Sequence, residues 1–244
     1  MTYTLHIANK RYSSWSMRPW VLFKALDIPF EEKLHFLQED LSQQRRDYLS
    51  FSPSAKVPTL VDNDSDNGST TLVHDSLAIA EYLAEDFPAV WPGDKLARAF
   101  ARCAAAEMHS GFPAIRNECS MNVALRIELG TPSEALQRDI GRLTELLDEG
   151  ISKFGGPWIA GKDFSAADAF YAPIASRCKT FGIQLAGPAG EYIDRLYEHP
   201  AVQAWVEEGI LEAGILARCE ADCIQGRKVL KNLGEQQILD FLGL

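Results

Sequence analysis

The sequence predicts a small α/β domain at the N-terminal end, followed by an all-helical domain. Two observations support this prediction. Short β-like and helical stretches alternate over the first 86 residues, whereas the rest of the chain shows long apolar patterns at helical spacing. Between them, residues 87–93 contain two prolines and a glycine, which end a helix and predict a linker. We therefore expect domains at residues 1–86 and 94–244, joined by the segment 87–93.

The α/β part reads as strand–helix–strand, followed by strand–strand–helix. Alternating and β-branched residues predict strands at residues 4–8, 30–36, 59–61 and 71–73. The first helix follows a polar loop, with Pro19 in its first turn, and runs to about Leu26. Two further helices are predicted at residues 40–49 and 76–86. We expect the first two strands to pair in parallel across a right-handed crossover, and the last two to form an antiparallel hairpin with its tip at residues 62–69.

All elements after the linker are predicted to be helices. Long periodic stretches cover residues 94–110 and 113–129. Residues 131–134 (Thr-Pro-Ser-Glu) and 165–168 (Ser-Ala-Ala-Asp) read as capping boxes, and the second opens an apolar helix through Phe181. Two more helices are predicted at residues 191–197 and 201–212, and a last amphipathic stretch lies after Glu220.

Composition and charge exclude several classes of function. The chain has 24 Lys and Arg against 34 Asp and Glu, so its formal net charge of −10 argues against a dedicated binder of nucleic acid or anionic membranes. No apolar run is long enough to span a membrane, and the first residues lack the pattern of a signal peptide. The five cysteines are scattered and predict no disulfide framework. We therefore expect a cytoplasmic protein.

Two motifs that could carry phosphate or metal chemistry are incomplete. Residues 156–162 fit the start of a phosphate-binding loop, but Asp163 stands where a Mg²⁺-binding Ser or Thr is needed, and Pro157 removes a backbone N–H. We interpret this stretch as a tight turn before a helix. Cys219 and Cys223 share a helical face without further ligands, and the five histidines are dispersed, so buried thiols are expected and no metal is predicted.

Three loops of the α/β part carry residues suited to a ligand. Ser13 and Ser14 lie between the first strand and the first helix, where a helix N-terminus stabilises anions such as thiolates; alternatively, one of them only caps the helix. Pro58 precedes the third strand and could form a cis bond or an ordinary trans strand start. Asp75 could pair with an ammonium, and Ser76 could hold a carboxylate at the next helix or only cap it.

These three loops, in this order of strands and helices, resemble the cytosolic glutathione transferase superfamily. The resemblance runs from about Thr4 to Glu212 and is most specific at residues 13–18, 57–60, 75–83 and 164–168. It implies a thioredoxin-like N-terminal domain that binds glutathione as co-substrate. It also implies an all-α C-terminal domain that supplies most of the site for a small hydrophobic electrophile, and a homodimer without a metal.

The resemblance also implies which hydroxyl acts on the glutathione sulfur. In serine-type members, the first residue of a C-x-x-C-like register carries that hydroxyl. Here the register is Ser13-Ser14-Trp15-Ser16, so Ser13 is the expected residue and Ser14 the reserve. No cysteine occurs in this loop, so glutaredoxin-like disulfide chemistry is not expected.

The peptide part of glutathione is assigned by the same resemblance. Val57 matches the residue whose backbone pairs with the cysteinyl moiety, and Pro58 matches the family's cis proline. Asp75 and Ser76 match the pair that holds the γ-glutamyl group. Lys56 stands where the zeta class often has Gln, and its cation could meet the glycyl carboxylate.

The Ser-Ser-x-Ser-x-Arg pattern looks most like the zeta class, which includes maleylacetoacetate isomerases. This chain departs from that class at Trp15, where the motif has Cys, and at Thr180, where zeta enzymes carry a substrate-carboxylate Arg. Arg177 lies one turn earlier on roughly the same face and could substitute for it. We expect Trp15, Met108, Phe112 and Arg177 to line the second-substrate pocket.

The leading hypothesis is a glutathione S-transferase that activates the glutathione thiolate for attack on a small electrophile. One alternative is a glutathione-dependent cis–trans isomerase of the maleylacetoacetate type. A second alternative is a non-catalytic binding or regulatory protein on the same fold, since a fold does not determine a function.

Overall fold

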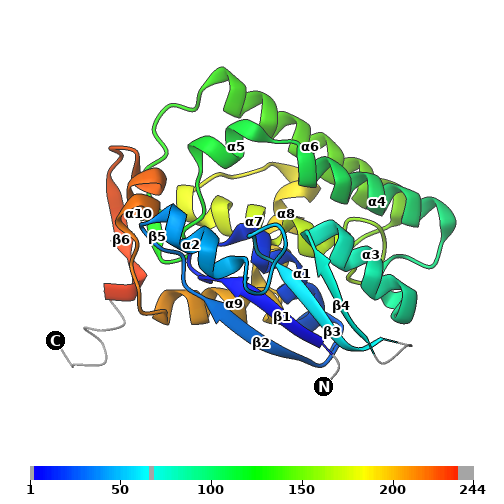
Figure 1. The fold of residues 1–244 in the computed structure, drawn as a ribbon. Helices are drawn as coiled ribbons and strands as arrows, with labels where there is room; N and C mark the ends of the chain where they lie inside the picture. Colours follow the sequence, from blue (N-terminus) through cyan, green and yellow to red (C-terminus); the bar gives the residue numbers. More distant parts are fainter. Residues whose placement is uncertain (1–2, 66–68, 236–244) are drawn as a thin grey trace, which may run out of the picture.

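The N-terminal part of the chain is built on a four-stranded mixed sheet (Figure 1). The computed structural model describes residues 3–65 and 69–235. The strands are β1 (Tyr3–Ala8), β2 (Phe30–His35), β3 (Thr59–Ser65) and β4 (Ser69–His74), in the order β2-β1-β3-β4. β1 and β2 are parallel, and β3 and β4 form an antiparallel hairpin, which confirms the predicted pairing. Part of the predicted hairpin tip, residues 66–68, lies outside the described residues.

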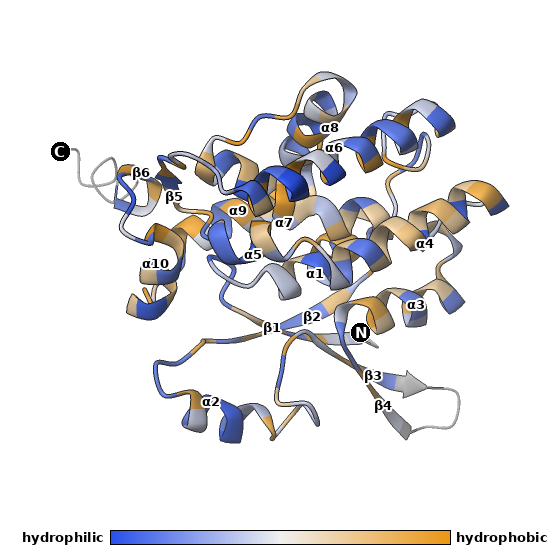
Figure 2. Ribbon diagram, turned by 90° about the horizontal axis from the view of Figure 1, so that it is seen from above, coloured by the Kyte–Doolittle hydropathy of each residue, from blue (hydrophilic) through white to orange (hydrophobic). Residues whose placement is uncertain are grey.

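Three helices accompany the sheet: α1 (Ser14–Ala25), α2 (Leu41–Tyr48) and α3 (Ser76–Asp86). α1 and α3 lie on the side of the sheet that faces the remaining helices, whereas α2 stands on the other side (Figure 2). The prediction that Pro19 lies in the first turn of α1 is wrong, because Pro19 is an interior residue of this helix. The helix starts earlier because Ser13 caps it and accepts a hydrogen bond from the Ser16 N–H.

The C-terminal part is mainly helical and is organised around one buried helix. After a short 3₁₀ turn at Pro88–Val90, the helices are α4 (Lys95–Ser110), α5 (Pro113–Glu118), α6 (Glu134–Phe154), α7 (Ala166–Phe181), α8 (Gly187–Glu198), α9 (Pro200–Leu211) and α10 (Ala217–Ile224). Every residue of α7 except Lys179 is buried, and α7 packs against α1. The predicted capping box is confirmed, because Ser165 and Asp168 exchange reciprocal hydrogen bonds at its start.

Two predictions about this part are wrong. The helix predicted over residues 113–129 ends at Glu118, and Leu125–Ile127 instead forms strand β5, which pairs with β6 (Val229–Asn232). Between them, the Asn122 side chain accepts a hydrogen bond from the Ala124 N–H, a local alternative to helical bonding. The N-terminal cap of α6 is Ser133 rather than Thr131, because the Ser133 hydroxyl accepts from the Leu136 N–H.

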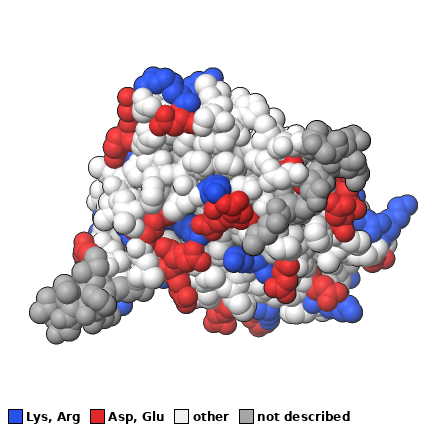
Figure 3. All heavy atoms as spheres, turned by 60° about the horizontal axis from the view of Figure 1, so that its bottom comes forward, with Lys and Arg blue, Asp and Glu red and all other residues white. Residues whose placement is uncertain are grey.

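One apolar core runs through both parts of the molecule. Residues from β1, α1, α4, α7 and α9 belong to the same cluster of buried side chains. At its centre, the rings of Trp20 on α1 and Trp205 on α9 meet edge to face, with centroids 5.3 Å apart. None of the helices in the described residues is long and apolar enough to cross a membrane. On the face drawn in Figure 3, acidic and basic side chains of the described residues are interspersed.

Candidate functional site

A cleft of about 590 Å³ lies where three loops of the N-terminal part meet. These loops are the β1–α1 turn, the segment before β3 and the β4–α3 turn. The lining residues are Tyr12, Ser13, Ser14, Trp15, Leu37, Gln44, Tyr48, Ser54, Ala55, Lys56, Val57, Pro58, His74, Asp75 and Ser76. The structure therefore brings together all the residues predicted for glutathione and for its sulfur. Of the residues predicted for the second substrate, only Trp15 lines this cleft.

The hydroxyl of Ser13 is engaged inside the β1–α1 turn. As the cap of α1, its oxygen accepts from the Ser16 N–H at 3.3 Å. The same hydroxyl donates to the Ser16 hydroxyl at 2.8 Å, which in turn accepts from the Ala8 N–H at 3.1 Å. This network fixes the turn at the end of β1 and places Ser13 at the positive end of the α1 dipole.

The hydroxyl of Ser14 is supported by a buried cation. Its oxygen accepts a hydrogen bond from Arg177 Nη2 at 3.4 Å. Arg177 on α7 also donates to the backbone carbonyls of Cys119, at 2.8 Å, and Pro173, at 3.3 Å. Burial, followed by the nearby charge of Arg116, lowers the pKa of Arg177 to about 10. Among the described residues, the Ser14 O–H has no acceptor, so it can donate to a ligand.

The β4–α3 turn has a similar arrangement. Asp75 caps α3 in the left-handed region, at φ 87°, and its carboxylate accepts from the Leu77 N–H at 2.8 Å. The Ser76 hydroxyl is buried and accepts from Arg18 Nη1 at 3.5 Å. Burial lowers the pKa of Arg18 well below its ordinary value, and the charges of Arg116 and Arg177 act in the same direction. Two buried guanidinium groups therefore support two hydroxyls of the cleft.

The segment before β3 lines the cleft through Lys56, Val57 and Pro58. The Val57–Pro58 bond is cis, as the resemblance to the family implied. Ser52 and Thr59 hold this segment, because both hydroxyls donate to the Lys56 carbonyl, at 2.7 Å and 3.0 Å. The side chain of Lys56 is exposed at the end of the cleft.

Trp15 lies at the mouth of the cleft and is 38% exposed. The guanidinium carbons of Arg18 and Arg116 lie 4.2 Å and 5.1 Å from its ring centroid. The ring of His109 meets it edge to face, and His109 Nε2 lies 3.4 Å from the Asp75 carboxylate. Burial lowers the pKa of His109, although the charge of Asp75 opposes this shift.

The other residues predicted for a second-substrate pocket do not line this cleft. Met108 and Phe112 are buried in the core, with exposed fractions of 1% and 5%. Arg177 is also buried, and its polar contacts are with backbone carbonyls and Ser14. Their role toward a second substrate remains a prediction.

Comparisons with known proteins agree with this geometry. Residues 12–86 match the family model described as glutathione S-transferase, N-terminal domain. The structure also resembles a glutathione transferase homologue from Burkholderia gl BGR1 that was crystallised with bound glutathione. The TM-score is 0.60 at 26% sequence identity, covering 85% of this chain and 97% of that chain. The fold is that of a glutathione S-transferase.

Similarity to curated proteins extends beyond the N-terminal part. The chain is 25% identical over 175 residues to a probable maleylacetoacetate isomerase of Caenorhabditis elegans, covering 71% of this chain and 77% of the relative. It is 28% identical over 178 residues to glutathione S-transferase 1 of Dianthus caryophyllus, covering 71% and 76%. These similarities extend along most of the chain, and they do not distinguish the zeta class from the other classes.

Sequence reasoning missed the supporting roles of Arg18 and Arg177. The available signal was an arginine inside an apolar helix, since such a residue is buried only where it has polar partners. Arg177 meets Ser14 because α7 packs on α1, and Arg18 meets Ser76 because α1 packs on α3; neither packing has a local signature in the sequence. Among the described residues, no three His, Cys, Asp or Glu side chains gather in a way that could hold a metal ion.

Proposed function

We propose that this protein binds glutathione in the cleft and stabilises its thiolate for attack on a small electrophile. The observation that carries the proposal is the meeting of three features: serine hydroxyls at the N-terminus of α1, backbone groups beside the cis proline, and the Asp75–Ser76 pair. A homodimer in the cytoplasm, as the family resemblance implies, is part of this proposal.

The peptide part of glutathione matches the charges and backbone groups of the cleft. Asp75 pairs with the γ-glutamyl ammonium, and Ser76 holds the neighbouring carboxylate at the N-terminus of α3. The backbone of Val57 pairs with the cysteinyl moiety, and Lys56 meets the glycyl carboxylate. Arg18 supports this arrangement because its buried charge lies behind the Ser76 hydroxyl.

The sulfur then lies against the β1–α1 turn. A free thiol has a pKa near 8.5, so activation means stabilising the thiolate with a hydroxyl donor and the positive end of α1. The thiol proton leaves to solvent, and a sulfur lone pair forms the new bond to the electrophilic carbon. The electrophile then releases a leaving group with its bonding electrons, or takes up a proton after addition to a double bond.

Ser13 is the proposed activating hydroxyl, and Ser14 is its rival. Ser13 has the family register and the cap position, but its proton is donated to Ser16 in the free protein and must turn toward the sulfur. Ser14 has a free proton and a buried cation behind its oxygen. The contacts of Ser14 therefore make a direct comparison of the two serines the decisive measurement.

We expect Ser13→Ala to lower conjugation of an activated chloroarene about tenfold or more, with nearly unchanged glutathione affinity, because one donor to the sulfur is lost. The reaction with the chloroarene measures conjugation, ultraviolet titration measures ionisation of the bound thiol, and calorimetry measures glutathione affinity. The same measurements on Ser14→Ala are the matched control. Loss of thiolate stabilisation only in Ser14→Ala would assign the role to Ser14, and loss in neither variant would contradict the serine mechanism.

A second candidate function is glutathione-dependent cis–trans isomerisation. The similarity to the probable maleylacetoacetate isomerase of Caenorhabditis elegans and the Ser-Ser-x-Ser-x-Arg pattern favour it. Incubation with a cis-configured enone diacid and catalytic glutathione tests this candidate, because an isomerase regenerates the thiol and a conjugating enzyme consumes it. Glutathione binding without either reaction would favour the binding or regulatory alternative.

A further inference from the structure

The chain after α9 returns to the N-terminal part and holds the loop that leads into Ser13. The Glu212 carboxylate accepts hydrogen bonds from Asn9 Nδ2 at 3.1 Å, from the Lys10 N–H at 2.9 Å and from the Arg11 N–H at 3.3 Å. In return, the Arg11 guanidinium donates to carbonyls at the end of α9. Three successive residues of the β1–α1 loop are thus fixed by a segment two hundred residues later.

Tyr12 connects this segment to the cleft itself. Its hydroxyl donates to Glu220 Oε1 at 2.6 Å and accepts from the Leu216 N–H at 3.3 Å. The same Glu220 oxygen accepts from Asn122 Nδ2 at 2.9 Å, which fixes the carboxylate from a second side. Burial, with the Glu220 hydrogen bond adding, raises the pKa of Tyr12, so the phenol stays a neutral donor. Tyr12 lines the cleft and directly precedes Ser13.

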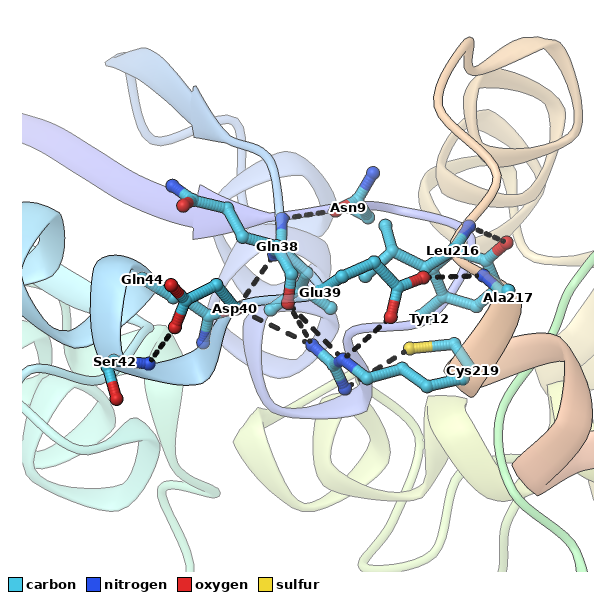
Figure 4. Close-up of polar contacts among 12 residues, drawn as sticks. Asn9, Tyr12, Gln38, Glu39, Asp40, Ser42, Gln44, Leu216, Ala217 and Cys219 are labelled. Atoms are coloured by element: carbon cyan, nitrogen blue, oxygen red, sulfur yellow. Dashed lines mark hydrogen bonds and ion pairs between the residues drawn. The ribbon is translucent and has the colours of Figure 1, made fainter.

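The same segment also contacts a second wall of the cleft, which is formed by the turn after β2 and helix α2 (Figure 4). Arg218 donates to the Gln38 carbonyl through Nε at 3.3 Å and Nη2 at 3.1 Å, and Nη2 also reaches Gln44 Oε1 at 3.5 Å. The Ala217 N–H donates to Glu39 Oε1 at 2.8 Å. Gln44 lines the cleft, and its side-chain oxygen also accepts from the Gln38 N–H at 2.9 Å.

Outside that segment, the wall is held mainly by the Leu37 N–H, which donates to Asn9 Oδ1 at 2.7 Å, and by Tyr48, whose hydroxyl donates to the His35 carbonyl at 3.2 Å. It consists of the turn after β2 and helix α2, and Tyr48 is the sole buried residue of α2. α2 stands apart from the helices on the other side of the sheet (Figure 2). An element with few buried apolar contacts opens locally at low cost, so polar anchors decide how often it is in place.

We propose that residues 212–220 form a C-terminal clamp that holds both walls of the cleft in the shape that binds glutathione. Arg218 and Glu220 are positioning residues in this proposal: Arg218 holds the α2 wall, and Glu220 holds Tyr12 beside the serines. The proposal rests on glutathione binding in this cleft. Because only the fraction of molecules with both walls in place binds tightly, loss of the clamp weakens apparent affinity in proportion to that fraction.

The test compares Arg218→Gln with Arg218→Lys and the wild type. We expect Arg218→Gln to raise the dissociation constant for glutathione about five- to twentyfold, because the α2 wall is then in place in a minority of molecules. Amide hydrogen exchange over residues 38–48 should become faster. The thiol pKa of bound glutathione should be unchanged, since the sulfur site is intact. For the same reason, the rate at saturation should stay within about twofold. Arg218→Lys should recover part of the affinity, because an ammonium can still donate to the Gln38 carbonyl.

Arg138→Gln is the matched control, because Arg138 on α6 is exposed and pairs only with Glu134 among the described residues. It should leave both affinity and exchange unchanged. Unchanged glutathione affinity or unchanged exchange at residues 38–48 in Arg218→Gln would overturn the clamp. If the wild type fails to bind glutathione while Arg218→Gln exchanges faster, the hold on α2 is supported and the proposed function is contradicted.

Discussion

Ser14 and Ser76 share an unusual environment, because the oxygen of each accepts a hydrogen bond from a buried guanidinium. Arg177 supports Ser14 and Arg18 supports Ser76. A cation that occupies the oxygen leaves the hydroxyl proton available to a ligand. The buried charges also favour anions nearby, since a low local dielectric strengthens their field. Under the proposed function, the Ser76–Arg18 pair faces the γ-glutamyl carboxylate, and the Ser14–Arg177 pair lies next to Ser13 at the sulfur.

The γ-glutamyl assignment is testable at Asp75 and Ser76. Asp75→Asn and Ser76→Ala should each weaken glutathione binding by roughly 1–3 kcal/mol, because each removes a charge-assisted contact. The effect should appear in the apparent affinity, with the rate at saturation much less affected. Calorimetry measures the change in glutathione affinity, and thermal melts measure any change in the stability of the fold. The expectation that Ser76 caps α3 is wrong, because Asp75 is the cap. If the pair serves only the fold, Asp75→Asn should leave stability nearly unchanged, since Asn caps about as well as Asp, and Ser76→Ala, which removes the Arg18 contact, should cost about 1 kcal/mol with no selective effect on the ligand.

Asp94→Asn provides the control for capping. Asp94 caps α4 by accepting from the Leu96 and Ala97 N–H groups, and it does not line the cleft. This substitution should leave glutathione binding unchanged. Normal glutathione affinity in a folded Asp75→Asn, Ser76→Ala double variant would remove the assigned γ-glutamyl site.

Elements with local signals were predictable from the sequence, and elements that depend on distant partners were not. α3 has the predicted bounds because Asp75, its apolar spacing and Pro88 all lie within or beside it. β5 was mistaken for helix because its partner β6 lies about a hundred residues later. For the same reason, the sequence identified the three cleft loops but not the contacts of Arg177 or Arg218, which come from other elements.

The two parallel strands carry a pair of histidines with a predictable pH dependence. His6 Nδ1 on β1 lies 2.8 Å from His35 Nε2 on β2, and the Phe51 ring stacks on both imidazoles. Burial lowers the pKa of His6 to about 4, and the charges of His35 and Lys33 add to this shift. Burial also lowers the pKa of His35. Only one proton can lie between the two facing nitrogens, so this site disfavours a doubly charged pair.

Because the folded pKa of His6 is below its unfolded value of about 6.5, the unfolded chain binds more protons in this range. Its contribution to stability is fully present above pH 6.5 and is lost as pH falls toward 4. We expect the urea midpoint to fall over this window, and to fall less in His6→Gln. His74→Gln, at an exposed histidine, is the control and should keep the wild-type slope. An equal slope in His6→Gln and wild type would exclude His6 as the source.

At the scale of the whole molecule, the two parts are joined by a buried charge as well as by apolar packing. The Lys10 ammonium lies between Glu32 on β2, at 2.7 Å, and Glu208 on α9, and only 4% of its side chain is exposed. It also lies 4.9 Å from the ring centroid of Trp20. Since α1 packs on both α7 and α9, neither part can lose its neighbour without exposing apolar surface. The molecule should therefore unfold as one unit.

Lys10→Met tests this unit directly. Removing one partner from a largely buried ion pair leaves the Glu32 carboxylate uncompensated, so we expect a loss of roughly 2–4 kcal/mol in the free energy of unfolding. Because the apolar stem is replaced by one of similar length, the Trp20–Trp205 packing should persist. Urea unfolding followed by tryptophan fluorescence and by far-ultraviolet circular dichroism should give coincident single transitions in the wild type and in Lys10→Met.

Lys33→Met is the matched control, because Lys33 pairs with Glu31 on the surface with about half of each side chain exposed. The loss of this pair should change stability by about 0.5 kcal/mol or less. Separate transitions by the two probes in the wild type would show that the two parts unfold independently, and a Lys10→Met variant as stable as the control would show that the shared apolar core alone joins them.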